Sequence, residues 1–368
     1  MKLKKVLALL LALSMVFALT ACKTTNDPGE TEAPTQSETP SQPVETAPSE
    51  EPSEEPSEES SEGPAPSTVG VRLAVLSGPT GIGAAKLLAD SDAGLTANAY
   101  EYTIATDNSE LVAGLTNPEP VFDIATVASN VAVNLYNKTD GGVQIIALGT
   151  LGVLHILESN GGTAINSVED LAGKTIYSAG QGANPEYILR YILSQNGIDP
   201  DNDVELIFAD ATEITQKLMT GEAEVAMLPV PAATAAIIKS EGKIRAALDV
   251  TEEWDALETG SQLIMTAVVA RTEFIQEHPE TVAAFLAEYE ASIDFVNSNV
   301  DEAAELIAGF GITPSAGIAK QAIPQCHLTY IAGGDMARAI SGYYNILWQA
   351  DPTAVGGALP DDAIFYVP

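Results

Sequence analysis

The chain has 368 residues, 46% of them apolar and 18% charged, a length that allows two domains of ordinary size. Its 16 Lys and Arg stand against 51 Asp and Glu, and the resulting net charge of −35 argues against a nucleic-acid partner. With 2 Cys and 3 His, the composition excludes a disulfide scaffold and disfavours a zinc site, so we expect no metal and no cofactor.

The first 22 residues have the pattern of an export signal. Lys2, Lys4 and Lys5 precede a run of 14 residues, Val6–Leu19, that is apolar except for Ser14, as in a secretory signal peptide. The run closes with Leu19-Thr20-Ala21-Cys22, which resembles the bacterial lipobox and implies a lipoprotein acylated on Cys22 with a palmitate-type lipid. An uncleaved membrane helix is the alternative, although the run falls short of the ~20 residues that span a bilayer. Both interpretations predict an exported, membrane-anchored protein.

Residues 23–68 differ sharply in composition from the rest of the chain. They are rich in Pro, Glu, Ser and Thr and hold 12 acidic residues against Lys23 alone. Such a segment cannot bury enough surface to offset its ordering entropy, so we expect a disordered acidic linker. Residues 69–368 carry 39 acidic and 12 basic side chains, so the folded part is itself strongly acidic. Acylation of Cys22 would leave Cys326 as a lone thiol, which we expect to be buried as a small hydrophobe.

Two segments of the body repeat one order of elements: strand, glycine-rich turn, helix, strand, helix, strand. In the first segment these are 71–76, 77–83, 84–89, 100–104, 109–115 and 123–126; in the second they are 174–177, 180–185, 185–193, 204–208, 213–219 and 224–227. The glycine turns are 99 residues apart (Gly83 to Gly182) and the last strands 101 (Asp123 to Glu224). This shared spacing predicts two similar α/β lobes with parallel sheets.

The chain is expected to cross between these lobes twice. Apolar runs at 143–148 and 153–157 flank the first crossing, and the run at 263–270 returns the chain to the first lobe. Amphipathic patterns at 279–296, 301–308 and 333–349 predict helices that pack back on the first lobe. We therefore predict a first lobe of residues 69–153 and 264–368, a second lobe of residues 154–263, and a two-stranded hinge.

The turns indicate binding and not catalysis. Ligands of open α/β sheets lie beyond the carboxyl ends of the strands, where the N–H groups of helix starts point at them. Two such starts, one in each lobe, can close on a small molecule. Enzyme motifs fail: Gly81-Ile82-Gly83 is followed by Lys86 where a dinucleotide fingerprint needs Gly or Ala, and Gly173-Lys174-Thr175 has Val168 where a phosphate loop needs Gly. We therefore expect that the protein is not an enzyme.

With the lipobox, the repeated lobes and the double crossing assembled, the chain resembles the solute-binding lipoproteins of ABC importers, in particular the SsuA/nitrate/THI5 (NMT1)-like family. The resemblance covers about residues 70–368 and rests on 75–81, 123–125, 135–138, 171–177, 180–183 and 227–229. It implies the type II periplasmic-binding-protein fold, an α/β architecture. It also implies a small-molecule ligand, permease and ATPase subunits as partners, a monomer, and a place on the outer face of a bacterial cell membrane.

The resemblance further implies which residues line the cleft. They come from the turns of both lobes and from the first crossing: Ser77, Thr80, Gly81, Thr126, Ser129, Asn130, Thr150, Leu151, Gly180, Gln181, Gly182 and Asn184, with His155 and Tyr177 as further candidates. The body's 12 bases all lie outside these turns, so no bidentate arginine clamp is visible. Hydroxyl and amide groups beside helix N-termini favour a neutral polar heterocycle, such as a pyrimidine or a vitamin precursor.

Three alternatives stay open. A sulfonate- or nitrate-type anion could occupy the same fold, since helix N-termini alone can hold an anion. A pyrimidine-forming synthase of eukaryotes shares the family resemblance, but it works inside cells and uses an active-site histidine. A surface adhesin on a flexible linker would bind host polymer and would leave the cleft without polar groups.

Overall fold

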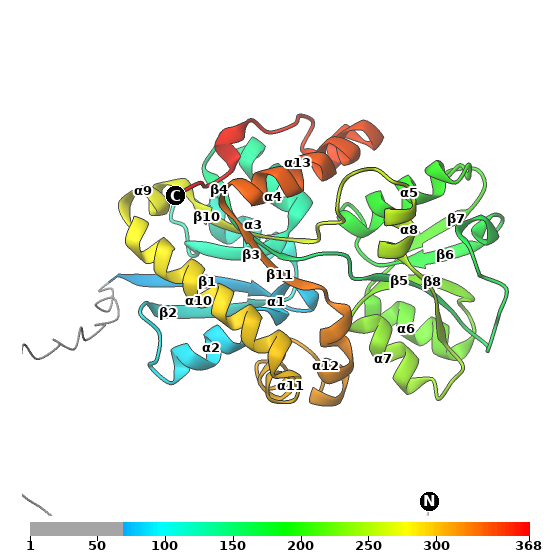
Figure 1. Cartoon of the computed structure of the whole chain (residues 1–368). Coiled ribbons are helices and arrows are strands. Elements are labelled where there is room, and N and C mark those ends of the chain that lie inside the picture. The colour runs from blue at the N-terminus through cyan, green and yellow to red at the C-terminus, as the bar shows by residue number, and fades with distance from the viewer. Residues whose placement is uncertain (1–68) are drawn as a thin grey trace, which may run out of the picture. The chain divides into compact units, whose positions relative to one another are not determined.

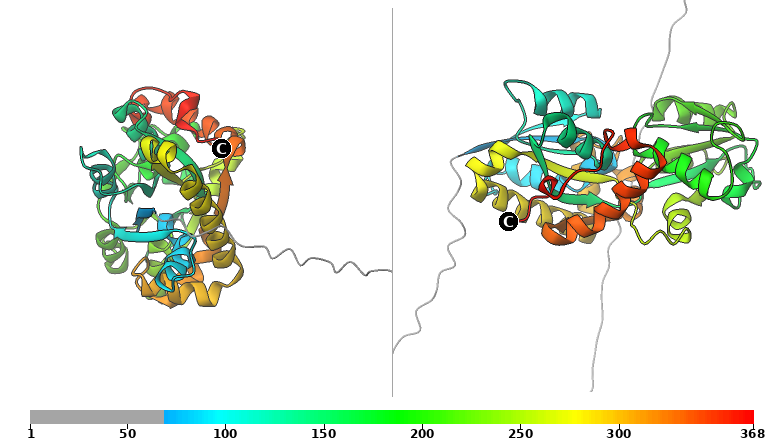
Figure 2. Two further views of the ribbon diagram at one scale, coloured as in Figure 1. Left: turned by 90° about the vertical axis from the view of Figure 1, so that its left-hand side faces the viewer. Right: turned by 90° about the horizontal axis from the view of Figure 1, so that it is seen from above.

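The structure, a computed structural model, describes residues 69–368. The signal peptide, the lipobox with Cys22 and the linker, all predicted within residues 1–68, lie outside the described residues. In the described part, no helix combines the length and the apolar character needed to cross a bilayer. Two β-sheets lie side by side, each with helices on its faces (Figures 1 and 2).

Six strands form the larger sheet, in the order β11-β4-β10-β3-β1-β2. They are β1 Gly70–Leu76, β2 Ala99–Ala105, β3 Ile124–Ala128, β4 Val143–Thr150, β10 Thr266–Arg271 and β11 Leu328–Ala332. β1 is parallel to β2 and β3, whereas β10 is antiparallel to β3 and β4, and β11 to β4. Its central strands are continuous buried apolar runs, as expected of a sheet covered on both faces. We call the part built on this sheet the first lobe.

Five strands form the second sheet, in the order β7-β6-β8-β5-β9. They are β5 Leu154–Glu158, β6 Thr175–Ser178, β7 Glu205–Phe208, β8 Val225–Pro229 and β9 Arg245–Asp249. β6 is parallel to β7 and β8, and β5 is antiparallel to β8 and β9. The two sheets therefore agree, strand by strand, in which neighbours are parallel and which are antiparallel when β2-β1-β3-β10-β4 is laid against β7-β6-β8-β5-β9. This agreement confirms two similar α/β lobes. We call this part the second lobe; the residue boundaries predicted for the lobes stay a proposal.

The helices of the first lobe are α1 Pro79–Ile82, α2 Ala85–Asp92, α3 Asn108–Thr116, α4 Ser129–Thr139, α9 Thr272–Glu277, α10 Pro279–Ser298, α11 Val300–Gly309, α12 Ala316–Ala322 and α13 Gly333–Ala350, with short turns η2 Ile323–Gln325, η3 Pro352–Val355 and η4 Asp362–Ile364. Among these helices, α1 and α10 begin with proline, and α3 and α12 begin at residues whose side chains cap them. The Asp107 carboxylate accepts the backbone N–H groups of Ser109 and Glu110 and so starts α3. The predicted first glycine turn contains helix α1, because Gly78 at φ 83 turns the chain and Pro79 suits a first helical position.

The second lobe has fewer helices. They are α5 Asn184–Gln195, α6 Ala211–Thr220, α7 Ala232–Lys239 and α8 Val250–Ala256, with the short turn η1 Val168–Leu171. Asp210 caps the start of α6, and Gly221 in the left-handed conformation ends it. Pro185 lies in the first turn of α5, as the sequence predicts.

The C-terminal helices reach further than expected. α10 packs on α2 and α11 on α12, within the first lobe, but α12 also contacts α7 and α13 contacts α5 of the second lobe. These helices pack on the first lobe, as expected, and the contacts of α12 and α13 with the second lobe were not foreseen. In the right-hand view of Figure 2, the orange helix α13 reaches the green second lobe, whereas the yellow helix α10 lies over the first lobe.

The two crossings between the lobes lie against each other. The first leaves β4 at Thr150, and the second enters β10, where Met265 N donates to Thr150 O (2.9 Å) and Thr266 pairs with Thr150. Gly152 in the first crossing has no room for a side chain, because a Cβ there would lie 2.1 Å from Thr251 Oγ1. These paired segments form the hinge, and close backbone packing fixes their path.

One hydrophobic core continues from the first lobe into the second. It includes one face of the second sheet, represented by Ile156 and Met227, whereas the opposite face packs with α6 and α7 in a separate, smaller cluster. Aromatic rings join the lobes within the larger core: the ring of Trp254 lies 5.2 Å from that of Tyr191 on α5 and 5.7 Å from that of Tyr343 on α13. Edge and offset contacts of this kind add to the energy of burial.

Candidate functional site

Ser129 and Asn184 join the two lobes at the starts of two helices. α4 begins at Ser129, directly after β3, and α5 begins at Asn184, after the glycine turn that follows β6. Asn184 Nδ2 donates to Ser129 Oγ (2.9 Å) and to Met265 O (3.2 Å), and both side chains are fully buried. One helix N-terminus of each lobe therefore meets the other beyond the carboxyl ends of the parallel strands, the usual ligand position in such sheets.

The Ser129 hydroxyl fixes the orientation of the Asn184 amide. Ser129 Oγ donates its hydrogen to Ile264 O (2.6 Å), so it can only accept from Asn184. The amide nitrogen of Asn184 thus faces the first lobe, and its Oδ1 is buried without a hydrogen-bond partner in the described part of the chain. Asn130 is similar, since its Nδ2 lies 3.5 Å from Gly182 O and its Oδ1 is buried and unpaired.

Two unpaired side-chain amide oxygens at the junction between the lobes indicate a place where a ligand could bind. Leaving a buried acceptor unsatisfied costs about 1–3 kcal/mol, which a ligand with N–H or O–H donors would recover. The Lys and Arg side chains that form hydrogen bonds in residues 69–368 have their partners elsewhere, so no cation is bonded to these amides. The junction therefore offers two uncharged acceptors, the Oδ1 atoms of Asn130 and Asn184.

The second-lobe turn is more exposed than its neighbours. Gln181 and Gly182 are exposed, and Gly180 and Gly182 have φ values of 81° and 69°, which favour glycine. Gly182 N donates to Glu186 Oε2 (2.8 Å), so the turn is held to the first turn of its own helix α5. Gly182 also contributes the carbonyl that faces Asn130, which places the turn at the junction.

The first-lobe turn is packed into its own lobe. Thr126 Oγ1 accepts from Leu76 N (3.0 Å) and ties the ends of β3 and β1 together. A Cβ at Gly81 would lie 2.3 Å from Leu76 O, Thr80 is buried, and Ser77 is half-buried. Within residues 69–368, the hydrogen bonds across this junction come from residues 129, 130 and 184 and not from this turn.

The crossing residues Thr150 and Leu151 are held by β10 and β11. Thr150 is buried in β4, and Leu151 N donates to the carbonyl of His327 (3.2 Å). A ring nitrogen of His327 lies 2.6 Å from the carbonyl oxygen of Gly152. Thr150 and Leu151 are therefore fixed by backbone contacts to neighbouring segments of the first lobe.

The uncertain candidates His155 and Tyr177 belong to the second sheet. His155 in β5 is 8% exposed and its Nδ1 lies 4.0 Å from Asp249 Oδ2. Burial lowers the pKa of His155 more than the nearby Asp249 raises it, which favours the neutral ring. Tyr177 packs with the smaller core cluster, and the Lys217 ammonium lies 5.9 Å from the centre of its ring.

Cys326 behaves as a buried hydrophobe, as the sequence predicts. It is fully buried, and burial raises the pKa of its thiol to about 12, so it carries no thiolate near neutral pH. Its neighbour His327 has φ 44° and is exposed, and Nδ1 of its ring lies close to the carbonyl oxygen of Gly152. The residue pair is therefore not arranged as a nucleophile and base. Residues 69–368 contain no group of three His, Cys, Asp or Glu suited to a metal ion.

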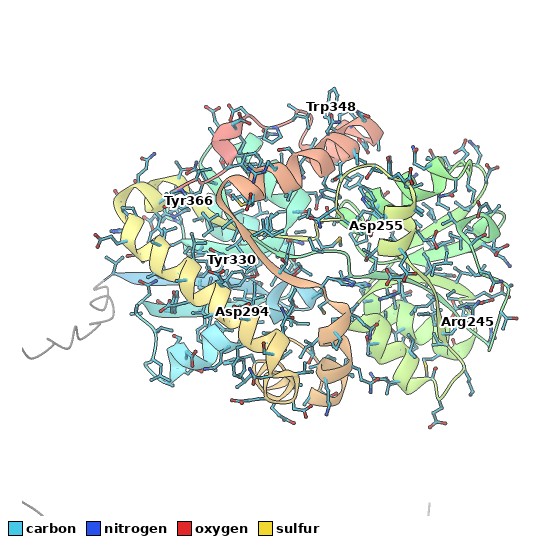
Figure 3. All side chains as sticks on the ribbon, viewed as in Figure 1. Arg245, Asp255, Asp294, Tyr330, Trp348 and Tyr366 are labelled. Atoms are coloured by element: carbon cyan, nitrogen blue, oxygen red, sulfur yellow. The ribbon has the colours of Figure 1, made fainter. Side chains whose placement is uncertain are left out.

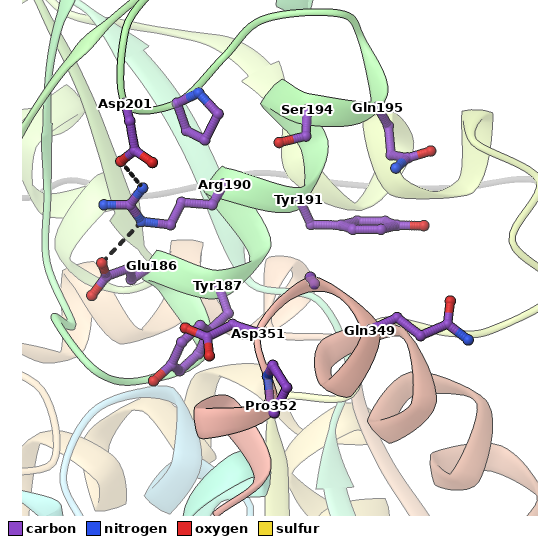
Figure 4. Close-up of a pocket in the computed structure, with 12 residues that line it drawn as sticks. Glu186, Tyr187, Arg190, Tyr191, Ser194, Gln195, Asp201, Gln349, Asp351 and Pro352 are labelled. Atoms are coloured by element: carbon purple, nitrogen blue, oxygen red, sulfur yellow. Dashed lines mark hydrogen bonds and ion pairs between the residues drawn. The ribbon is translucent and has the colours of Figure 1, made fainter. Parts of the chain in front are cut away.

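A groove of about 800 Å³ lies outside the predicted set (Figure 4). It runs between α5 of the second lobe and the end of α13 with η3 of the first lobe, and it is lined by Glu186, Tyr187, Arg190, Tyr191, Ser194, Gln195, Pro200, Asp201, Gln349, Ala350, Asp351 and Pro352. Sequence reasoning missed it. The i, i+4 repeat of tyrosines on α5 was a usable signal for one wall, but the second wall comes from the far end of the chain.

Comparisons with known proteins agree on the fold. The model of the NMT1/THI5-like family matches residues 92–303. An ABC transporter structure from Parabacteroides distasonis is 24% identical, with a TM-score of 0.66 over 80% of this chain and 98% of that one. The periplasmic aliphatic sulphonate binding protein SsuA from Escherichia coli is 13% identical, with a TM-score of 0.65 over 81% and 92%.

A further structure, a putative periplasmic sulfonate-binding protein from Methylobacillus flagellatus, is 17% identical, with a TM-score of 0.62 over 81% of this chain and 92% of that one. A search of curated proteins gave no significant match. Together with the two matching sheets, these likenesses establish the type II periplasmic-binding-protein fold for residues 69–368.

Proposed function

The chain belongs to the NMT1/THI5-like family, and we propose that it is the solute-binding component of an ABC importer. It captures a small polar molecule between its lobes as a monomer, without changing the molecule, and presents it to permease and ATPase subunits. The observation that carries this proposal is the Ser129–Asn184 contact, where two helix starts from different lobes meet beside buried, unpaired amide oxygens. The names of the solved structures with this fold support the transport role.

For the ligand, we favour a neutral heterocycle such as a pyrimidine or a vitamin precursor. Oδ1 of Asn130 and Oδ1 of Asn184 can accept hydrogen bonds. At the helix starts, Ser129 N already donates to Met265 O (3.0 Å), Glu186 N donates to Ala183 O (3.1 Å), and Pro185 has no N–H. A planar ring with N–H donors matches the two amide oxygens. A sulfonate- or nitrate-type anion is the second candidate, because two of the fold's solved examples are named for sulfonates. Two carbonyl oxygens at the junction disfavour an anion there.

The experiment that tests the proposal identifies what the protein carries. Mass spectrometry after gentle denaturation should find a co-purifying neutral heterocycle, and adding that compound back should raise the melting temperature. Ligand at 100 times its Kd stabilises a protein by about 2.7 kcal/mol. Small-angle scattering should detect a change in lobe spacing. Recovery of a sulfonate would favour the second candidate, and recovery of a chemically altered compound would contradict simple capture.

The variant Asn184→Ala tests the site itself. It removes both the free acceptor and the bonds to the first lobe, so we expect ligand affinity to fall about tenfold or more, the factor that matches ~1.4 kcal/mol. Asn117→Ala is the matched control, because Asn117 is an exposed asparagine at the end of α3. Equal affinity in the two variants would exclude this junction as the ligand site.

We also propose that Cys22 carries the lipid that anchors the protein to the outer face of the cell membrane. The lipobox Leu19–Cys22 and the apolar run before it support this assignment. In an expressing bacterium, labelled palmitate should be incorporated into the wild-type chain and not into Cys22→Ala, which should appear in the soluble fraction. A labelled Cys22→Ala chain would refute the assignment.

A further inference from the structure

The groove between α5 and the α13–η3 junction combines aromatic rings with excess negative charge. Tyr187 and Tyr191 lie one helical turn apart on α5 and contribute to the same wall. Three carboxylates line the groove, those of Glu186, Asp201 and Asp351, against the single guanidinium of Arg190. The groove is thus net anionic, within a body that is itself strongly acidic.

Arg190 is already neutralised by its neighbours. Its Nε donates to Glu186 Oε1 (3.0 Å) and its Nη1 to Asp201 Oδ1 (2.8 Å), as the dashed lines of Figure 4 show. Asp351 accepts from Thr353 N (2.8 Å) and has no arginine or lysine bonded to it in residues 69–368. It lies beside Tyr187 (Figure 4). Arg190 can offset only one of the two carboxylates that it contacts, so two negative charges stay unneutralised in the groove, and one of them is that of Asp351, next to an aromatic ring.

We propose that this groove is a second ligand site, which binds small organic cations with an apolar body. A ring face and a carboxylate together attract such a cation, since the ring quadrupole and the negative charge act in the same direction. Its volume of about 800 Å³ lies within the usual range for small-molecule pockets. An anion would meet an excess of carboxylates and an arginine that already pairs with two of them.

The groove is connected to the junction between the lobes in two ways. Its walls belong to different lobes, so a bound cation favours the relative lobe position that closes around it. Glu186, in one wall, also accepts the N–H of Gly182 (2.8 Å), the turn whose carbonyl faces Asn130. A cation in the groove therefore changes the affinity for the solute, and the solute changes the affinity for the cation by the same factor. This coupling rests on the proposed function, whereas cation binding does not.

Choline and its neutral isostere 3,3-dimethyl-1-butanol are a matched pair of probes, because they have the same shape and differ in charge. By calorimetry on the full-length chain, choline should bind saturably and the isostere should not. Asp351→Asn should weaken choline binding about fivefold or more, the factor that matches ~1 kcal/mol. Asn at 351 can still accept the Thr353 N–H, so the local turn is kept.

Two further variants separate the ring from its hydroxyl. Tyr187→Leu should weaken choline about fivefold, and Tyr187→Phe should retain the affinity, because a phenylalanine ring keeps the negative face that attracts a cation. The exposed Asp294 lies on α10, remote from the groove (Figure 3), so Asp294→Asn is the control for net charge and should bind choline like the wild type. Equal binding of the two probes, or unchanged binding in Asp351→Asn, would overturn the proposal.

The cleft variant distinguishes this proposal from the solute-binding function. If Asn184→Ala loses choline while Asp351→Asn keeps it, the cation occupies the junction, and the groove assignment is wrong while solute capture stands. If Asn184→Ala binds choline normally but loses the co-purifying solute, both proposals hold. Coupling is then measured as the ratio of the solute affinities with and without saturating choline. In Glu186→Gln this ratio should lie closer to one than in the wild type.

Discussion

The two lobes share one strand order but differ in how their sheets are covered. In the first lobe, both faces of the sheet and the added strand β11 belong to one large core. In the second lobe, one face shares that core, and the other packs alone with α6 and α7 around Leu218 and Ile214. The two lobes therefore share a strand order but not a packing arrangement. One face of the second sheet packs in the core shared with the first lobe, and the opposite face packs only with helices of its own lobe.

This difference indicates where the molecule can move. The aromatic rings of Tyr191, Trp254 and Tyr343 connect α5 and α8 of the second lobe to α13 of the first. Tyr344, next in the chain, donates its hydroxyl to Ser129 O (2.7 Å) at the start of α4. Packed interiors resist deformation, so this aromatic contact should oppose movement of the lobes about the hinge. The α6–α7 face, with its own cluster, should follow as a rigid body.

The largest effect is expected from Trp254→Ala. Trp254 is fully buried at the contact between the lobes, and its Nε1 donates to Ser261 O (2.7 Å). Its removal should lower the free energy of unfolding by about 4 kcal/mol, because a large aromatic side chain leaves a cavity. Chemical denaturation measures this loss. The matched control is Trp348→Ala, since Trp348 is 38% exposed on α13, and a similar loss there would contradict the shared core.

Leu218→Ala tests the independent half of the second lobe. Leu218 on α6 is 1% exposed and belongs to the smaller cluster. We expect a loss of about 3 kcal/mol in the stability of that cluster. Hydrogen exchange should accelerate in α6 and α7 and stay unchanged in α5, because α5 belongs to the larger core. Equal acceleration in α5 would mean that the second lobe unfolds as one unit.

The variant Asp123→Asn probes the ion-pair cluster of the first lobe. Asp123 accepts from Arg72 Nε (2.8 Å) and Arg271 Nη2 (2.9 Å), and only 4% of its side chain is exposed. Because the Arg72 side chain is 39% exposed, we expect the free energy of unfolding to fall by about 2 kcal/mol at pH 7, less than for a fully buried ion pair. In the second lobe, Glu158 pairs with Arg245 alone, so Glu158→Gln is the matched comparison and should cost less.

The same carboxyl makes stability depend on pH. Burial raises the pKa of Asp123, but hydrogen bonds from Arg72 and Arg271 outweigh it and hold the pKa below its ordinary value. The stability that this carboxylate contributes is complete above its pKa in the unfolded chain, about 4. That stability is lost as the pH falls through the lower pKa of the folded state. Denaturation at pH 7 and pH 3 should therefore show a smaller acid loss in Asp123→Asn than in the wild type.

The smallest effect is expected at the crossing. Gly152→Ala places a Cβ 2.1 Å from Thr251 Oγ1 and 3.0 Å from Leu263 Cδ2. We expect a loss of about 1–2 kcal/mol, since the neighbours must shift to accept it. The double variant with Thr251→Ala removes the nearest atom and should recover part of the loss. Gly317→Ala is the control, because nothing lies within 4 Å of a Cβ there. No recovery in the double variant would exclude this clash as the cause.

The local elements could be predicted from the sequence. The apolar runs give β1, β2, β6 and β8 within a residue or two, and Pro185 and Asp107 mark helix starts. The spacing of about 100 residues between equivalent strands indicates the repeated lobes. These signals are local because turn residues, caps and alternating burial act over a few neighbouring positions. The family resemblance added candidate site residues from all the turns without ranking them.

Only the tertiary structure showed which of those candidates lie together and which residues meet between the lobes. Ser129 meets Asn184, Trp254 meets Tyr343, and the groove wall of Tyr187 meets Asp351. Each contact joins residues far apart in the chain, and its geometry depends on how one lobe docks on the other. That docking is decided by the sum of many buried contacts, including α12 and α13 against the second lobe, and no short segment of sequence carries it.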